Sequence, residues 1–314
     1  MTESTHQSSA QFPDRVPWLA VVAFIVVAFG LAWLVALPLW ANGGLRNPMA
    51  KVVLVVMMYA PAAAALAVLQ TVQRPRPTSI AAYLGVWPLR PEGRTLLFCL
   101  IGIFGGASLI IAGVFLAAAL GFVRLDLVHF SGFRAVVEYK THRPLSKPAG
   151  LLVAVQILML PAGAMLNSVA TVGEELGWRG WLLPSLRPLG TWPALIISGA
   201  VWGLWHAPII LLGYNFNEPN LFGVAMMTGN CVVLGILVGW LRLRSASVWP
   251  AVFAHGSINA AAGFASLVAM AGTSMDPVIA GPGGWVTWIV MGVVIAVLAA
   301  TGQFRLQPRA AVPS

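Results

Sequence analysis

Long apolar runs separated by short polar connections dominate the chain. A helix needs roughly 20 apolar residues to cross a bilayer core of about 30 Å, and about eight segments reach or approach that length. They cover residues 18–41, 48–72, 95–121, 150–171, 192–213, 221–241, 246–267 and 284–302. The pattern therefore predicts an all-α fold, a polytopic membrane helix bundle of about eight transmembrane helices.

The polar connections show how these helices are grouped. The longest are 73–94 and 122–149, and the second has room for an amphipathic surface helix. The first apolar run, which begins at Trp18, is too long for a signal-peptide core and lacks a clear cleavage site, so we interpret it as a retained span. No repeat and no low-complexity linker divides the sequence. We therefore expect residues 1–314 to form one integral membrane domain.

Composition strengthens this interpretation. Hydrophobic residues make up 59% of the 314 and charged residues only 9%, against about 25% charged in soluble domains. That deficit excludes a soluble enzyme and a nucleic-acid-binding domain. The net charge is +9, but Lys and Arg lie between the apolar runs and are more numerous on the side of the N-terminus, which favours cytoplasmic termini. Cys99 and Cys231 lie inside apolar runs and form no disulfide framework.

Only a few ionisable residues lie close to the apolar spans, away from the tails and the basic connections. Such residues are costly in lipid and mark function by default. They are concentrated between residues 174 and 259, so we expect the helices over 150–267 to carry the chemistry. The set, with one amide included, is Glu174, Glu175, Arg179, His206, His255 and Asn259.

The spacing around the two glutamates has geometric content. Glu175 and Arg179 are four residues apart and share a helix face, so they can neutralise each other at low dielectric. Glu174 is rotated by about 100° around the helix from Glu175, so Arg179 is less well placed to form an ion pair with it. We therefore expect one carboxylate to be structural and the other to be chemically free.

The two histidines follow the same spacing. Trp202 and His206 are four residues apart, so the indole can pack against the imidazole, and His255 and Asn259 project together from one span. If the fourth span ended near residue 171, Glu174 would lie at the membrane surface, with His206 roughly 20 Å deep. We therefore expect one extended helix of roughly 25–33 residues over about 151–183, which brings these side chains together.

Three motifs carry a family resemblance. They read Glu174-Glu175-Leu-Gly-Trp-Arg179, Trp202-Gly-Leu-Trp-His206 and His255-Gly-Ser-Ile-Asn259. In this order they resemble the motifs of the intramembrane CAAX-protease and bacteriocin-processing family, which includes the Ras-converting endopeptidases. The family usually has Phe where this chain has Trp202, and the aromatic character is kept.

The resemblance implies a role for each motif residue. Glu174 is similar to the general base that holds a water molecule with help from His206. His255 and Asn259 are similar to the donors that stabilise the oxyanion of a tetrahedral intermediate, and Glu175 and Arg179 to structural support for the first motif. The implied activity is that of an intramembrane endopeptidase. Burial strengthens a carboxylate as a base near neutral pH, which agrees with these roles.

The cofactor and the substrate stay open at this point. Glu174, His206 and His255 can supply a ligand set for a single zinc ion, but one carboxylate cannot easily be both ligand and base, so a metal-free mechanism is slightly favoured. The implied partners are the bilayer and a membrane-embedded or lipidated peptide or protein. An Ala-, Gly- and Arg-rich composition favours a multi-pass protein of a bacterial plasma membrane, where unprenylated substrates are more plausible.

Two alternatives remain. The same ionisable residues can form the relay of a proton-coupled transporter, although repeated halves and paired broken helices are not evident. A non-catalytic scaffold or immunity protein can keep the family fold, although retention of every motif residue argues against degeneration.

Overall fold

The computed structural model describes residues 13–73, 79–89 and 91–305. Within these residues the chain forms helices and no sheet, with a single isolated bridge between Leu125 and Ala269. The predicted all-α class is therefore confirmed. The arginines at 74 and 76, and both chain ends, lie outside the described residues, so the predicted side of the termini stays a prediction.

Six helical segments of the described chain are long and apolar enough to cross a membrane. Five of them agree with predicted spans to within four residues at each end, and the sixth, predicted over 284–302, begins earlier, at Pro277. A bent pair raises the number to as many as seven. The protein is therefore a multi-pass membrane protein. The six are α1 (Trp18–Ala41), α2–α3 (Ala50–Met57 and Ala60–Thr71), α5 (Glu92–Ala119), α12 (Leu221–Ser245), α13–α14 (Trp249–Ala261 and Phe264–Val268) and α15–α16 (Pro277–Ala280 and Trp285–Ala300).

The predicted span 192–213 does not form a helix long enough to cross a membrane. It forms α10 (Thr191–Trp205) and the single turn α11 (Ala207–Ile210). The 15 residues of α10 are fewer than the roughly 20 that a bilayer core requires. The helix ends at His206, and Pro208 lies in the first turn of α11, where a missing N–H is tolerated. His206 consequently lies at a helix end rather than in mid-helix.

The predicted long helix over 151–183 exists, but it is bent. α7 (Ala149–Leu158) meets a continuous helical stretch, Leu160–Leu189, at an angle of 51°. The bend falls at Met159, next to Pro161 in the first turn of α8 (Leu160–Glu175), because proline cannot donate the helical hydrogen bond. The stretch continues through the π-helix η2 (Leu176–Leu182), α9 (Leu183–Leu186) and the turn η3 (Arg187–Leu189). Glu174 therefore lies well inside a helix.

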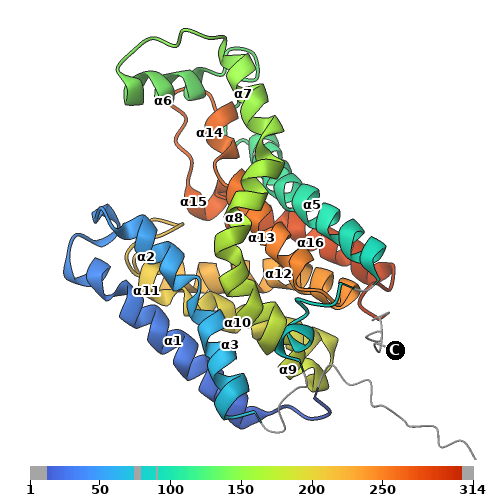
Figure 1. The fold of residues 1–314 in the computed structure, drawn as a ribbon. Helices are drawn as coiled ribbons and strands as arrows, with labels where there is room; N and C mark the ends of the chain where they lie inside the picture. Colours follow the sequence, from blue (N-terminus) through green and yellow to red (C-terminus); the bar gives the residue numbers. More distant parts are fainter. Residues whose placement is uncertain (1–12, 74–78, 90, 306–314) are drawn as a thin grey trace, which may run out of the picture.

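Shorter helices complete the fold. The connection 122–149 contains α6 (Ser131–Thr141), which confirms a helix there. In Figure 1, α6, α7 and α14 form one end of the molecule, and α8 runs from there through its centre. The remaining turns are η1 (Gly44–Arg46) and α4 (Ile80–Tyr83).

Glycine pairs spaced by four residues let the central helices approach closely, as is common in membranes. On α10, Cβ atoms at Gly199 and Gly203 would lie 2.7 Å and 2.4 Å from backbone atoms of α12. On the long helix, a Cβ at Gly177 would lie 2.3 Å from Pro61 of α3. α13 packs between α5 and α8, where a Cβ at Gly256 would lie 2.5 Å from the Ala164 carbonyl oxygen. The motif-bearing helices are thus held backbone to backbone.

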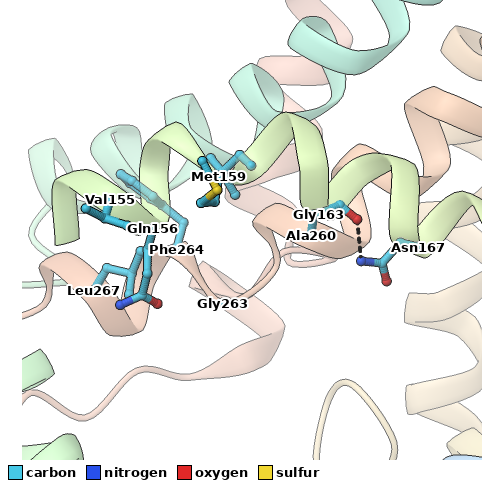
Figure 2. A pocket seen from close by; sticks show the side chains of 10 residues that line it. Val155, Gln156, Met159, Gly163, Asn167, Ala260, Gly263, Phe264 and Leu267 are labelled. Carbon is cyan, nitrogen blue, oxygen red and sulfur yellow. Dashed lines mark hydrogen bonds between the residues drawn. The ribbon is translucent and has the colours of Figure 1, made fainter. Parts of the chain in front are cut away.

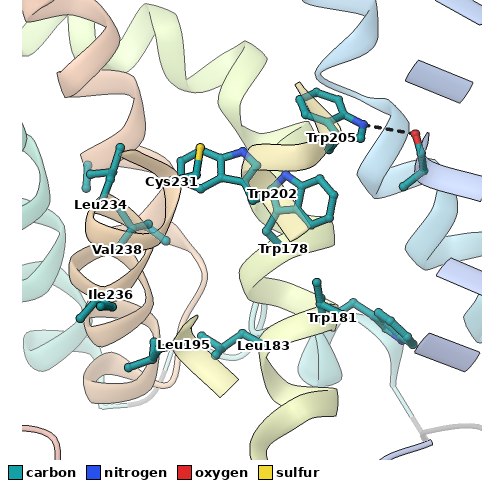
Figure 3. Packing of buried hydrophobic residues seen from close by; sticks show 14 of the residues in the cluster. Trp178, Trp181, Leu183, Leu195, Trp202, Trp205, Cys231, Leu234, Ile236 and Val238 are labelled. Atoms are coloured by element: carbon teal, nitrogen blue, oxygen red, sulfur yellow. Dashed lines mark hydrogen bonds between the residues drawn. The ribbon is translucent and has the colours of Figure 1, made fainter. Parts of the chain in front are cut away.

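Four tryptophans fill the centre of the bundle. Trp178, Trp181, Trp202 and Trp205 are all at most 2% exposed, and Figure 3 shows them between α12 and the N-terminal helices. Trp178 and Trp205 meet edge to face at 5.7 Å, and the Trp205 indole donates to the Ala28 carbonyl. Trp202 and Trp205 of this layer also contact His206, with ring centroids 5.9 Å and 4.8 Å away.

Candidate active site

The two glutamates stand at the end of α8, where the helix widens. Glu174 and Glu175 are its last residues, and the π-helix η2, which carries Arg179, begins at the next position. π-Helical turns occur frequently at functional sites. The side chains of Glu174, Glu175 and Arg179 are 0–2% exposed. Their charges and hydrogen-bonding groups therefore need partners inside the bundle, because burying them unpaired is costly.

Glu175 joins the first motif to the third. Its Oε1 atom accepts hydrogen bonds from Arg179 Nη1 and from His255 Nδ1, both at 2.9 Å. The predicted Glu175–Arg179 pair is therefore present. Because Oε1 already accepts from the arginine, it is the acceptor of the imidazole as well, so His255 Nδ1 is the donor and Nε2 is the ring atom left for other partners. Glu175 thus contacts a second motif as well, which the spacing of its own motif does not predict.

Trp202 joins the second motif to the first. Its indole Nε1 donates to Glu174 Oε2 at 2.6 Å, and the Arg179 guanidinium lies over its ring at 4.1 Å from the centroid. A phenylalanine, which is usual in the family, keeps the cation–π contact but has no N–H to donate. Among the described residues, Oε1 of Glu174 has no hydrogen-bond partner. Trp202 therefore fixes Oε2, and Oε1 can still accept a hydrogen bond.

His206 has a defined tautomer. Its Nδ1 lies 2.9 Å from the Trp202 carbonyl oxygen, and a carbonyl only accepts, so Nδ1 carries the proton and Nε2 presents a lone pair. The predicted packing of Trp202 on His206 is present, with ring centroids 5.9 Å apart. On the other side, the Trp202 ring meets His255 at 5.3 Å. Trp202 therefore stands between the two histidines.

Six of the seven predicted residues thus form one buried cluster from three stretches of chain: Glu174, Glu175, Arg179, Trp202, His206 and His255. Asn259 is different. It lies one turn beyond His255 on α13, but its side chain is exposed and makes no hydrogen bond within the described chain. The structure places Asn259 next to the cluster and not inside it.

The described residues do not arrange a metal site. No group of three or more His, Cys, Asp or Glu side chains among them could hold a metal ion. The hydrogen bonds of the three residues considered for zinc leave one donor atom free on each, because they use Glu174 Oε2 and the Nδ1 atoms of His206 and His255. Histidines that bind a metal commonly donate their other ring N–H in this way, so the choice between a single zinc ion and a metal-free mechanism stays a prediction.

Two residues of the site region were missed from the sequence. Arg242, which the charge pattern assigned to membrane topology, is fully buried in α12, and its Nε donates to the Arg179 carbonyl at 3.1 Å. Its Nη1 and Nη2 have no partner among the described residues. Tyr214 follows α11; burial raises the pKa of its phenol, and the negative charge of nearby Glu174 raises it further. Nothing in the motif spacing pointed to either.

Comparison with known proteins points to one family. Residues 156–261 match the model of the Rce1-like family, described as type II CAAX prenyl endopeptidase Rce1-like. A curated relative, CAAX prenyl protease 2 of Methanococcus maripaludis, is 32% identical over 98 residues, which are 29% of this chain and 36% of that protein. The chain thus spans about a third of the relative's length.

The matched region coincides with the cluster described above. It begins in α7 and ends at the last residue of α13, so it includes all three motifs. The resemblance seen in the motifs is thereby confirmed: over residues 156–261, the chain is similar to the Rce1-like CAAX prenyl endopeptidases.

Proposed function

We propose that the protein is an intramembrane endopeptidase that hydrolyses a peptide bond of a membrane-associated peptide or protein. The observation that carries the proposal is the meeting of the three motifs inside the bundle at the Glu174 carboxylate, of which Oε2 is held by Trp202 and Oε1 has no hydrogen-bond partner among the described residues. The family match and the relative's name support the same class of reaction.

Glu174 is the proposed general base. The indole of Trp202 holds Oε2, which leaves Oε1 to accept a hydrogen bond from a water molecule. His206, with its proton fixed on Nδ1, presents Nε2 as a second acceptor for that water. A base must lie within hydrogen-bond reach of the proton that it removes, and two acceptors orient the water.

The proposed reaction balances as follows. Glu174 takes a proton from the water as the oxygen adds to the carbonyl carbon, and a tetrahedral oxyanion forms. The intermediate collapses as the C–N bond breaks, and the proton held by Glu174 passes to the leaving amine. His255, oriented by Glu175, and Asn259, one turn along α13, are the proposed donors to the oxyanion; each such donor is worth roughly 2.7–4 kcal/mol.

The exposure of Asn259 is compatible with this role, since an amide that is free in the protein alone can bind a substrate. The Tyr214 phenol, close to Glu174, is a further candidate donor. Tyr214→Phe and Asn259→Ala separate the two. We expect the variant that removes the true donor to lower kcat about 100-fold or more, with little change in KM.

The test is a cleavage assay with purified protein in proteoliposomes. A panel of prenylated and unprenylated membrane peptides is expected to include at least one that is hydrolysed, and Glu174→Ala is expected to abolish hydrolysis while the protein still folds. Glu92→Gln, an exposed acid at the start of α5, is the matched control and should retain full activity.

Three results discriminate among the functions. Cleavage by Glu174→Ala at the wild-type rate would refute the proposed base. No cleavage of any peptide, together with proton-dependent solute uptake, would favour the transporter, and neither activity would favour a scaffold. Chelator treatment in the same assay tests the metal-free mechanism, which predicts an unchanged rate.

A further inference from the structure

A pocket outside the catalytic cluster lies between α7–α8 and α13–α14. Its volume is about 320 Å³, and its walls are mostly apolar. Figure 2 shows Met159 at the bend between α7 and α8, and Gly263, Phe264 and Leu267 on the opposite wall, which the end of α13 and α14 form. The volume is at the small end of the range for ligand pockets, enough for one large side chain with its flanking backbone.

Two amide side chains line this otherwise apolar pocket. Gln156 of α7 is exposed and makes no hydrogen bond among the described residues. Asn167 of α8 donates to the Gly163 carbonyl at 2.8 Å, which leaves its Oδ1 free in the described structure. An amide side chain can both donate and accept hydrogen bonds. The two amides therefore offer the polar partners that an extended peptide backbone needs beside the apolar walls.

The position of the pocket connects it to the cluster. Asn167, Thr171 and Glu174 lie on one face of α8 at helical spacing, and Glu174 is about 10 Å along the helix from Asn167. On α13, Ala260 is about 7.5 Å and Gly263 about 12 Å of chain rise from His255. An extended peptide advances about 3.3 Å per residue, so these distances correspond to roughly two to four residues.

We propose that this pocket is a specificity subsite that receives a bulky apolar side chain of the substrate peptide, two to four residues from the scissile bond. The inference rests on the proposed function. Gln156 and Asn167 bond the extended backbone of the substrate, and the apolar walls enclose the side chain. A hydrocarbon chain fits the apolar walls equally well but has no group that can bond to Gln156 or Asn167, whereas a peptide backbone has both donors and acceptors.

Gly263→Leu is the variant that fills the pocket. No atom lies within 4 Å of a Cβ placed at Gly263, so the new side chain can enter the pocket without a clash. Gly292→Leu is the matched control, because Gly292 of α16 is exposed, does not line the pocket and has equally open space around it. Asn167→Leu removes one amide at similar side-chain size.

The substrates are paired peptides based on one that the wild-type protein cleaves, with Leu or Ala at each position two to four residues from the cleaved bond. At one position the wild-type protein is expected to prefer Leu by 10-fold or more in kcat/KM. Gly263→Leu is expected to remove that preference and to cleave the Ala peptide within about three-fold of wild type. Gly292→Leu should keep the preference.

Two results would overturn the subsite. The first is that Gly263→Leu lowers kcat/KM equally for the Leu and the Ala peptide. The second is that the wild-type preference depends on an isoprenoid chain attached to the peptide and not on the Leu or Ala side chain. Asn167→Leu is expected to raise KM about ten-fold for both peptides, with kcat retained.

Crosslinking tests peptide binding at the subsite separately from peptide cleavage. A photo-crosslinking peptide is incubated with Glu174→Ala protein, which is expected to bind the peptide without hydrolysing it. Labelling of residues 155–167 that Gly263→Leu abolishes supports peptide binding even if nothing is cleaved, and labelling elsewhere contradicts it.

Discussion

Replacing Glu175 by glutamine tests the network at the centre of the site. One oxygen of Glu175 accepts from both Arg179 and His255 at 2.9 Å, and all three side chains are buried. Solvent therefore screens the pair little, and removal of one partner leaves a buried charge uncompensated, which costs about 3–5 kcal/mol. We expect Glu175→Gln to lower the free energy of unfolding by that amount.

A double-mutant cycle sharpens the test. Arg179→Met leaves the Glu175 carboxylate with His255 as its remaining hydrogen-bond partner and should cost a similar amount, while the double variant removes both charges. If the residues act as a pair, the double variant is expected to lose about 2 kcal/mol less than the sum of the single variants. The measurement is reversible denaturation in mixed detergent micelles, with Glu92→Gln as a control that stays within about 0.5 kcal/mol of wild type. Additive losses, or a Glu175→Gln protein as stable as wild type, would refute the network.

Two further predictions concern single contacts. Trp202→Phe keeps the ring under the guanidinium but removes the indole N–H from Glu174 Oε2, so we expect a loss of about 1.5–3 kcal/mol in the same unfolding assay; an unchanged stability would show that the hydrogen bond is unimportant. Gly177→Ala places a Cβ 2.3 Å from Pro61 and is expected to cost about 1–3 kcal/mol, whereas Gly105→Ala, with open space around it, should leave stability equal or slightly higher.

The sequence predicts the spans well because apolar length is a local property. Five of the expected helices agree with the structure to within four residues at each end, and the Glu175–Arg179 pair follows from spacing alone. The two disagreements are also local. Pro161 bends the long helix at Met159, and α10 ends at His206 before it reaches the length of a span. Hydropathy averages over such breaks and does not detect them.

The contacts between motifs are what the sequence does not contain. That one carboxylate oxygen serves both Arg179 and His255 depends on how α13 packs against α8, through close approaches such as that at Gly256. The motif spacing places Trp202 against His206, but the direction of its indole N–H toward Glu174 is a tertiary fact. The exposed position of Asn259 likewise depends on neighbours that its own helix does not specify.

Arg242 has a consequence for how the protein assembles. It lies three residues before the end of α12, so in an inserted but isolated helix its long side chain can reach water at the membrane surface. Docking removes the guanidinium from water and gives it the Arg179 carbonyl in return. Helices in membranes insert first and associate later. The free-energy cost of desolvating this cation therefore falls on the late association step. The hydrogen bond that Arg242 gains in that step is made to the π-helical turn beside the two glutamates.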